Sequence, residues 1–148
     1  MNIIECVRNT VSRFDKISKI CDAVHVDFTN AQATSYGLSP TGDTLIKENI
    51  LGDQIRQHTF ILYAVYQSLN DYDRLSNSGV LLELQQWLEM QSGVELTVEI
   101  ESKTYRGKLN KLIPSNGMIY SIPDENLNEN VRYQLQITAE YTIFNEEV

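Results

Sequence analysis

The chain has 148 residues, of which 42% are hydrophobic and 22% are charged. This composition and length predict one globular domain over residues 1–148 and argue against a disordered segment. Twenty Asp and Glu against twelve Lys and Arg give a formal net charge of −8. Such an excess of acids argues against a dedicated nucleic-acid binder and against docking on anionic membranes, because both need clustered basic side chains.

The longest apolar run, residues 60–66, is far shorter than the ~20 residues that span a bilayer. No signal-peptide pattern opens the sequence. We therefore expect a soluble protein that acts or is assembled in the cytoplasm. Its two cysteines, Cys6 and Cys21, are too few for a disulfide framework, and we expect both to be reduced core or near-core residues.

The N-terminal part of the chain predicts a helix followed by a strand. Apolar residues recur every three or four positions from Ile3 to Ile17, which predicts a helix over residues 3–20. Residues 23–30 then alternate between apolar and polar, as in a strand with one wet face. His25 lies on the polar side of this alternation, so we interpret it as a solvent-facing residue and not as a ligand.

The next part predicts a loop and a hairpin. Residues 31–43 contain Pro40 and Gly42 among polar residues, which predicts a loop. Residues 44–51 are extended, Gly52-Asp53 is a plausible hairpin turn, and residues 54–66 predict a long central strand rich in β-branched and aromatic residues.

A second helix is predicted over residues 80–91. Residues 70–73 break the chain before it and do not fit a calcium loop. Ser78 is a reasonable N-cap, Ser92-Gly93 is a reasonable stop, and Trp87 is expected to be a core anchor.

The remaining sequence predicts strands, turns and one solvated loop. The strands cover residues 96–100, 105–113, 118–122 and 131–144, the turns cover 101–103 and 114–117, and the loop covers 123–130. Together these elements predict an α+β fold with a mostly antiparallel sheet flanked by two principal helices.

Motifs for catalysis are missing from the sequence. No Gly-rich phosphate loop, His-x-x-x-His, Cys-x-x-Cys or Gly-x-Ser-x-Gly occurs, and the two histidines fall on separate predicted strands. Glu99 and Glu101 have same-face spacing, but exposed acids at this spacing usually serve solvation. We predict a structural or interaction protein that is no enzyme and uses no cofactor or metal.

Five segments carry a resemblance to a known family. They are SYGLSPTG (35–42), KENILGDQ (47–54), FILY (60–63), LQQWLEMQ (84–91) and RYQLQITAEY (132–141). In order and spacing they resemble the tail terminator, or tail completion, proteins of long-tailed phages and prophages of Gram-positive bacteria. The match covers about two-thirds of the chain, and residues 95–108 depart from the family's pattern.

This resemblance implies a virion protein at the junction of tail and neck, assembled in the host bacterial cytoplasm. Such proteins form a hexameric ring on the finished tail tube, which ends polymerisation and presents a surface to the head connector. The implied partners are further copies of the chain, the tail tube protein, the neck or connector protein and, in contractile tails, the sheath protein. DNA would pass through the ring without specific binding. The implied fold, a small sheet flanked by helices, agrees with the predicted element order.

A ring needs a head-to-tail contact that closes on rotation. The predicted loop around residues 36–42 and the edge of residues 44–51 are our candidates for it. The candidate interface residues are Tyr36, Leu38, Pro40, Leu45 and Arg56. The candidate lumen acids, which would repel passing DNA, are Asp124, Glu125 and Glu129. An alternative explanation of the net charge of −8 is that it only keeps the free subunit soluble before assembly.

Three other functions fit the sequence. Another ring-forming neck protein, a connector or a stopper, is the nearest alternative. A small enzyme or ligand-binding domain would need a deep pocket with convergent polar groups. A cytoplasmic adaptor unrelated to virions is the third.

Overall fold

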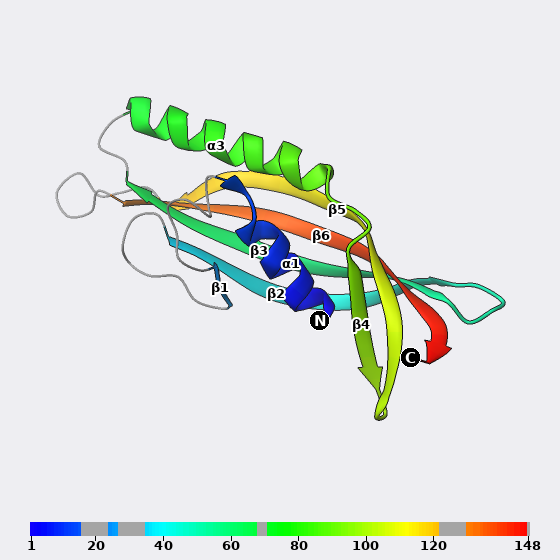
Figure 1. Cartoon of the computed structure of the whole chain (residues 1–148). Helices are drawn as coiled ribbons and strands as arrows, with labels where there is room; N and C mark the ends of the chain where they lie inside the picture. The colour runs from blue at the N-terminus through cyan, green and yellow to red at the C-terminus, as the bar shows by residue number, and fades with distance from the viewer. Residues whose placement is uncertain (16–23, 27–34, 68–70, 122–129, 148) are drawn as a thin grey trace.

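The computed structural model describes residues 1–15, 24–26, 35–67, 71–121 and 130–147. Two helices and six strands lie in these ranges (Figure 1). In chain order the elements are α1 (Ile3–Ser12), β1 (Val24–Val26), β2 (Ser35–Glu48), β3 (Gln54–Gln67), α3 (Asp71–Glu89), β4 (Glu95–Ile100), β5 (Lys103–Ser121) and β6 (Asn130–Glu147).

All six strands form one sheet in the order β1-β2-β3-β6-β5-β4. Every neighbouring pair is antiparallel except the short β1, which runs parallel to β2. The expected α+β class with a mostly antiparallel sheet is therefore confirmed. The long central strand predicted over residues 54–66 is also confirmed, because β3 covers Gln54–Gln67 and lies between β2 and β6.

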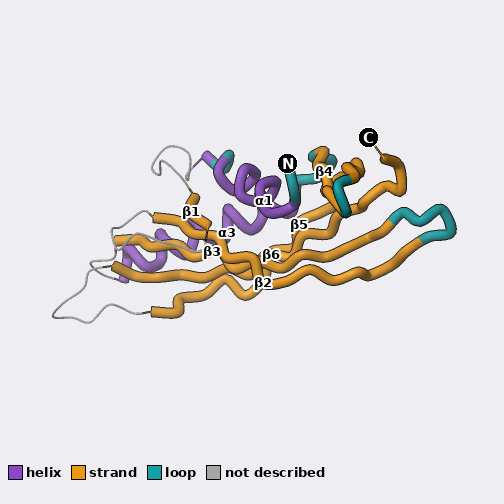
Figure 2. Tube along the Cα trace, turned by 90° about the horizontal axis from the view of Figure 1, so that it is seen from below, coloured by secondary structure: helices purple, strands orange, loops and turns teal. Residues whose placement is uncertain are grey.

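Both helices contribute to a single core with one face of the sheet. Figure 1 shows α1 crossing in front of the sheet and α3 running along β5, and Figure 2 shows the layers from below. Phe14, just after α1, contacts Trp87 of α3 with ring centroids 5.4 Å apart, which joins the two helices directly.

The alternating burial of side chains along β6 shows which face of the sheet packs against the helices. From residue 133 to 143 its odd-numbered residues are buried, and from 132 to 144 its even-numbered residues are half-buried on the opposite face, as the sequence predicts. The buried set is Tyr133, Leu135, Ile137, Ala139, Tyr141 and Ile143. On β3, Phe60 and Leu62 oppose Ile137 and Leu135, so the centre of the core lies over this strand pair.

Two of the predicted turns are confirmed. β2 and β3 are joined by a turn in which Gly52 has a φ of +85°. β4 and β5 are joined by Glu101 and Ser102, both with positive φ, which is the geometry of a two-residue hairpin.

The loop predicted over residues 31–43 is wrong from residue 35 onward, because β2 begins at Ser35. Proline and glycine predicted a break, but both are tolerated on an outer strand at a bulge. The pairing of β2 with β3 shifts register between Pro40 and Gly42, and β1 covers β2 only at residues 36–38. Gly117 was a similar false signal: β5 runs through the predicted turn at 114–117 and shifts register between Ser115 and Met118.

The second helix begins at Asp71, nine residues earlier than predicted, so the break at residues 71–73 and the N-cap role of Ser78 are wrong. Apolar periodicity marks only the part of a helix that packs on a core, and the first half of α3 has a polar sequence. The helix ends at Glu89, two residues before the predicted end at 91, and Gly93 follows with a φ of +78°.

Several predicted features lie wholly or partly outside the described residues. The helix predicted over residues 3–20 is confirmed to Ser12, but Arg13 caps it there, so the prediction is too long; residues 16–20 are outside the described residues. Of the strand predicted over residues 23–30, only residues 24–26 are described, with His25 in β1. Cys6 is a free, buried cysteine of α1 as expected, and burial raises the pKa of its thiol. Cys21 lies outside the residues that the structure describes.

Neither described helix is long and apolar enough to cross a membrane.

Candidate functional site

The strands β2 and β3 continue past the helices as a projecting hairpin (Figures 1 and 2). We call residues 43–56 the hairpin arm. Four of its aliphatic side chains are exposed, with exposed fractions of 44% for Leu45, 52% for Ile46, 104% for Ile50 and 75% for Leu51. Exposed aliphatic side chains gathered on one projection are typical of a protein-interaction surface. The arm is therefore the candidate functional site.

The tip of the arm is held by hydrogen bonds. Within the turn, the backbone N–H of Asp53 donates to Asn49 Oδ1 at 3.0 Å, and Asn49 Nδ2 donates to Asp53 Oδ2 at 3.3 Å. Asn145 of β6 donates its backbone N–H to Asp53 Oδ1 at 2.8 Å and its side-chain amide to the Leu51 carbonyl at 2.9 Å. These bonds fix the backbone that displays Ile50 and Leu51, so the apolar tip is ordered before any partner binds.

A polar cluster holds the base of the arm. Arg56 Nε of β3 lies 2.6 Å from Asp43 Oδ1 of β2, and the Tyr141 hydroxyl of β6 donates to Asp43 Oδ2 at 2.5 Å. Arg56 also donates to the Gln54 side chain at 3.0 Å. We call Asp43, Arg56 and Tyr141 the base cluster; it joins three adjacent strands where the sheet leaves the helices.

The base cluster keeps its charges paired and its phenol protonated. Burial, followed by the hydrogen bond to Asp43, raises the pKa of Tyr141 above its ordinary value. The hydrogen bond to Asp43 is the largest of the effects that raise the pKa of the Arg56 guanidinium. The Tyr141 hydroxyl therefore acts as a permanent donor near neutral pH, which suits a structural tie.

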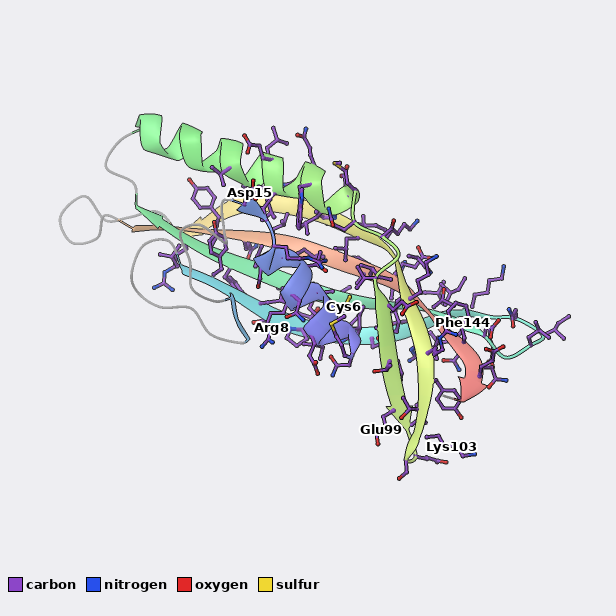
Figure 3. The ribbon with its side chains drawn as sticks, in the orientation of Figure 1. Cys6, Arg8, Asp15, Glu99, Lys103 and Phe144 are labelled. Atoms are coloured by element: carbon purple, nitrogen blue, oxygen red, sulfur yellow. The ribbon has the colours of Figure 1, made fainter. Side chains whose placement is uncertain are left out.

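A half-open hollow lies beside the arm, with a volume of about 170 Å³. We call it the end hollow. The arm, the β4–β5 hairpin and the end of β6 all contribute to its walls, and Figure 3 shows Phe144 at this end of the sheet. Its lining residues are Glu48, Gly52, Gln54, Ile100, Tyr105, Ile143, Phe144 and Asn145.

The end hollow is lined by both apolar and polar residues, and Gln54 and Asn145 are among the polar ones. Ile100, Tyr105, Ile143 and Phe144 provide apolar surface, and Glu48 is its one acidic lining residue. Among the described residues, no group of three His, Cys, Asp or Glu side chains is placed to hold a metal ion. His58 is buried and stacks on Phe60 at 4.5 Å between ring centroids, away from this hollow's lining.

The structure divides the predicted interface residues into two sets. Tyr36 and Leu38 are fully buried in the core, so their side chains anchor β2 and are not free to contact a partner. Leu45 is exposed and pairs in register with Arg56 on the arm, whereas Pro40 is half-buried. Arg56, which is also a predicted interface residue, forms an ion pair with Asp43 of its own chain. The predicted lumen acids Asp124, Glu125 and Glu129 lie outside the described residues.

Sequence reasoning missed the most exposed part of the site. Ile50 and Leu51 were assigned only to an extended segment, yet they form the tip. The available signal was local: two adjacent aliphatic residues stand between Asn49 and Gly52, in a turn where polar residues are usual.

Comparison with known proteins adds no relative to this description. No protein-family model matches the chain, and a search of the curated proteins finds no match to it either. The functional argument therefore depends on the residues of this chain alone.

Proposed function

We propose that this protein is a structural ring subunit that caps a phage tail tube, ends its polymerisation and joins the tail to the head connector. In this function six copies associate head to tail, the ring sits at the junction of tail and neck, and DNA passes through it. The order and spacing of the five sequence segments supply the family resemblance. The α+β fold with an antiparallel sheet is compatible with it.

The observation that carries the proposal is the hairpin arm. A ring subunit must present a surface that the free chain leaves uncovered and that is ordered in advance, because ordering it during assembly would weaken association. Ile50 and Leu51 meet both conditions, since they are exposed and their backbone is tied to Asp53 and Asn145. The same tip has no evident use for a small enzyme, whose reactive groups converge in a pocket.

The charge of the chain suits a passage for DNA. Six copies would carry a formal charge of −48, six times the −8 of one chain. Acidic side chains facing the opening would repel the phosphate backbone and keep DNA from adhering to the ring.

The direct experiment is a tube-growth assay. Purified tail tube protein is polymerised with and without the chain, and tube lengths are measured by negative-stain electron microscopy. We expect the chain to bind at one tube end and stop growth there. An Ile50→Asp/Leu51→Asp variant should lose this effect, whereas a Leu82→Asp/Met90→Asp variant should keep it, because Leu82 and Met90 are exposed aliphatic residues of α3 and its end. Tubes that grow equally long with the wild-type chain would contradict the proposed function.

A further inference from the structure

The two ends of the sheet differ in how well they could accept a further strand. The sheet ends at β1 on one side and at β4 on the other. β1 has three residues, and β2 beside it contains Pro40 and two register shifts; short strands, proline and bulges all hinder strand addition. β4 has six residues, contains no proline and pairs with β5 without a register shift. β4 is therefore a regular outer strand that lacks these forms of protection.

The hairpin geometry shows which backbone groups of β4 face away from β5. Ile100 and Lys103 close the two-residue turn as a hydrogen-bonded pair. In an antiparallel ladder every second residue of β4, counted back from Ile100, then also bonds to β5, and the residues between them direct their N–H and C=O groups outward. These outward residues, which we call the edge positions, are Glu95, Thr97 and Glu99.

Met1 occupies the middle edge position. The Thr97 N–H donates to the Met1 carbonyl at 2.8 Å, which agrees with its outward direction. The Met1 nitrogen donates to Thr97 Oγ1 at 2.9 Å, and the Asn9 side-chain amide of α1 donates to the Met1 sulfur at 3.4 Å. Figure 1 shows the N-terminus beside β4. Met1 therefore pairs with the outer edge of β4 while its side chain contacts α1.

The position of Met1 is set by the helix that follows it. Asn2 is the N-cap of α1: its side chain accepts from the Glu5 N–H at 2.9 Å, and its carbonyl accepts from the Cys6 N–H at 2.9 Å. Cys6 and Val7 are fully buried, so this first turn is anchored in the core. Packing of α1 therefore places Met1 against β4.

We propose that Met1 protects the edge of β4 against the addition of a strand from another molecule. Strand addition depends on consecutive backbone pairs along the edge. With Thr97 bonded to Met1, Glu95 and Glu99 are left as separate single positions, on which an incoming strand cannot make two adjacent pairs. The inference does not rest on the proposed function, because it concerns an edge outside the hairpin arm.

Two chains that differ only in Met1 test this protection. One begins at residue 2 and carries Asn2→Met, and the other is the full chain with Asn2→Met, so both lack the N-cap side chain. Intact mass confirms the first residue of each. Amide hydrogen exchange followed by NMR should show a protected Thr97 N–H in the full chain and several-fold faster exchange in the shortened one, with Glu99 unchanged. Equal exchange of Thr97 in both chains would overturn the inference.

The second measurement is self-association. Both chains also carry Ile50→Asp/Leu51→Asp, which removes the proposed arm contact, so failure of the proposed ring does not affect the result. Sedimentation velocity is run in about 1 M salt, which screens repulsion between the acids of two β4 strands. The shortened chain should form larger species at a concentration about 5- to 30-fold lower, the effect of one or two backbone hydrogen bonds. The same size distribution for both chains would contradict the protection.

A further pair of variants locates the new contact. Glu99→Pro removes an outward N–H and spares the bonds between β4 and β5, as proline does on an outer strand. Added to the shortened chain, it should abolish the additional association. Glu99→Ala is the matched control, because it removes the same acid and keeps the N–H, so the association should persist. Association that survives Glu99→Pro would come from another surface and would overturn the inference.

Discussion

The two halves of the β3–β6 pair are built from the same strands but are stabilised in different ways. Under the helices, Phe60 and Leu135 are fully buried in the common core. Beyond the helices, the strands are tied by polar groups: the base cluster of Asp43, Arg56 and Tyr141, and the hydrogen bonds between Asn145 and the tip. In the arm beside this outer half, Leu45, Ile46, Ile50 and Leu51 are exposed, so their side chains contribute little to folding and remain available for a partner.

The largest expected effect is in the helix-covered half. Phe60→Ala removes a fully buried ring between β2 and β6, and large-to-small changes of this kind lower the free energy of unfolding by about 3–5 kcal/mol. Urea unfolding followed by circular dichroism measures it. A loss below about 1 kcal/mol would contradict the core assignment.

In the arm, Gly52→Ala should have the next largest effect. A Cβ at this position would lie 2.5 Å from Asn145 Nδ2, and the φ of +85° disfavours any side chain. The clash would displace the amide that donates to the Leu51 carbonyl, so we expect a loss of about 1–3 kcal/mol and faster amide exchange at residues 49–53.

Gly79→Ala is the matched control. Gly79 lies inside α3 with nothing within 4 Å of an added Cβ, so alanine should stabilise the helix by about 0.5–1 kcal/mol. Equal destabilisation by the two substitutions would show that the turn is not held as described.

The base cluster predicts a smaller effect that depends on pH. Tyr141→Phe removes the hydroxyl that donates to Asp43 and should lower the free energy of unfolding by about 1–2 kcal/mol at pH 7. Because folding raises the pKa of Tyr141, the unfolded chain loses this proton first. The stabilisation is therefore complete below the ordinary tyrosine pKa of about 10 and decreases above it. Unfolding from pH 7 to pH 11 should show the difference between wild type and variant shrinking above about pH 10; a constant difference would contradict the buried donor.

The smallest effect on stability is expected at the tip. Ile50→Ala and Leu51→Ala remove exposed side chains and should change the free energy of unfolding by no more than about 0.5 kcal/mol. Their thermal unfolding midpoints should match that of the wild type. A clear destabilisation would mean that the tip belongs to the fold and would weaken its assignment as an interaction surface.

The helix-covered half could be predicted from the sequence because burial leaves a periodic pattern. Alternation along residues 133–143 correctly identified the buried face of β6, and the turn at Gly52 was found from its composition. Where local signals and tertiary context conflict, the predictions fail. Pro40 and Gly42 indicated a loop, yet they lie on β2 at a register shift with little of β1 beside them.

The candidate site was predicted only in part, because exposure depends on tertiary structure. Of the predicted interface residues, Leu45 and Arg56 lie on the arm, whereas Tyr36 and Leu38 are core residues. Leu38 and Leu45 are the same residue type on the same strand, and only their places under the helices and beyond them make one buried and the other exposed. The hydrogen bond between the Tyr141 hydroxyl and Asp43 also could not be predicted from the sequence, because the two residues are 98 positions apart.

Native mass spectrometry over a range of protein concentrations tests the central claim, that the exposed arm is an assembly contact of a six-membered ring. We predict a species of about 102 kDa, six times the chain mass of 17.0 kDa, that disappears in the Ile50→Asp/Leu51→Asp variant and persists in the Leu82→Asp/Met90→Asp control. A dimer as the largest species at every concentration, or a 102 kDa species unchanged by the tip substitutions, would contradict it.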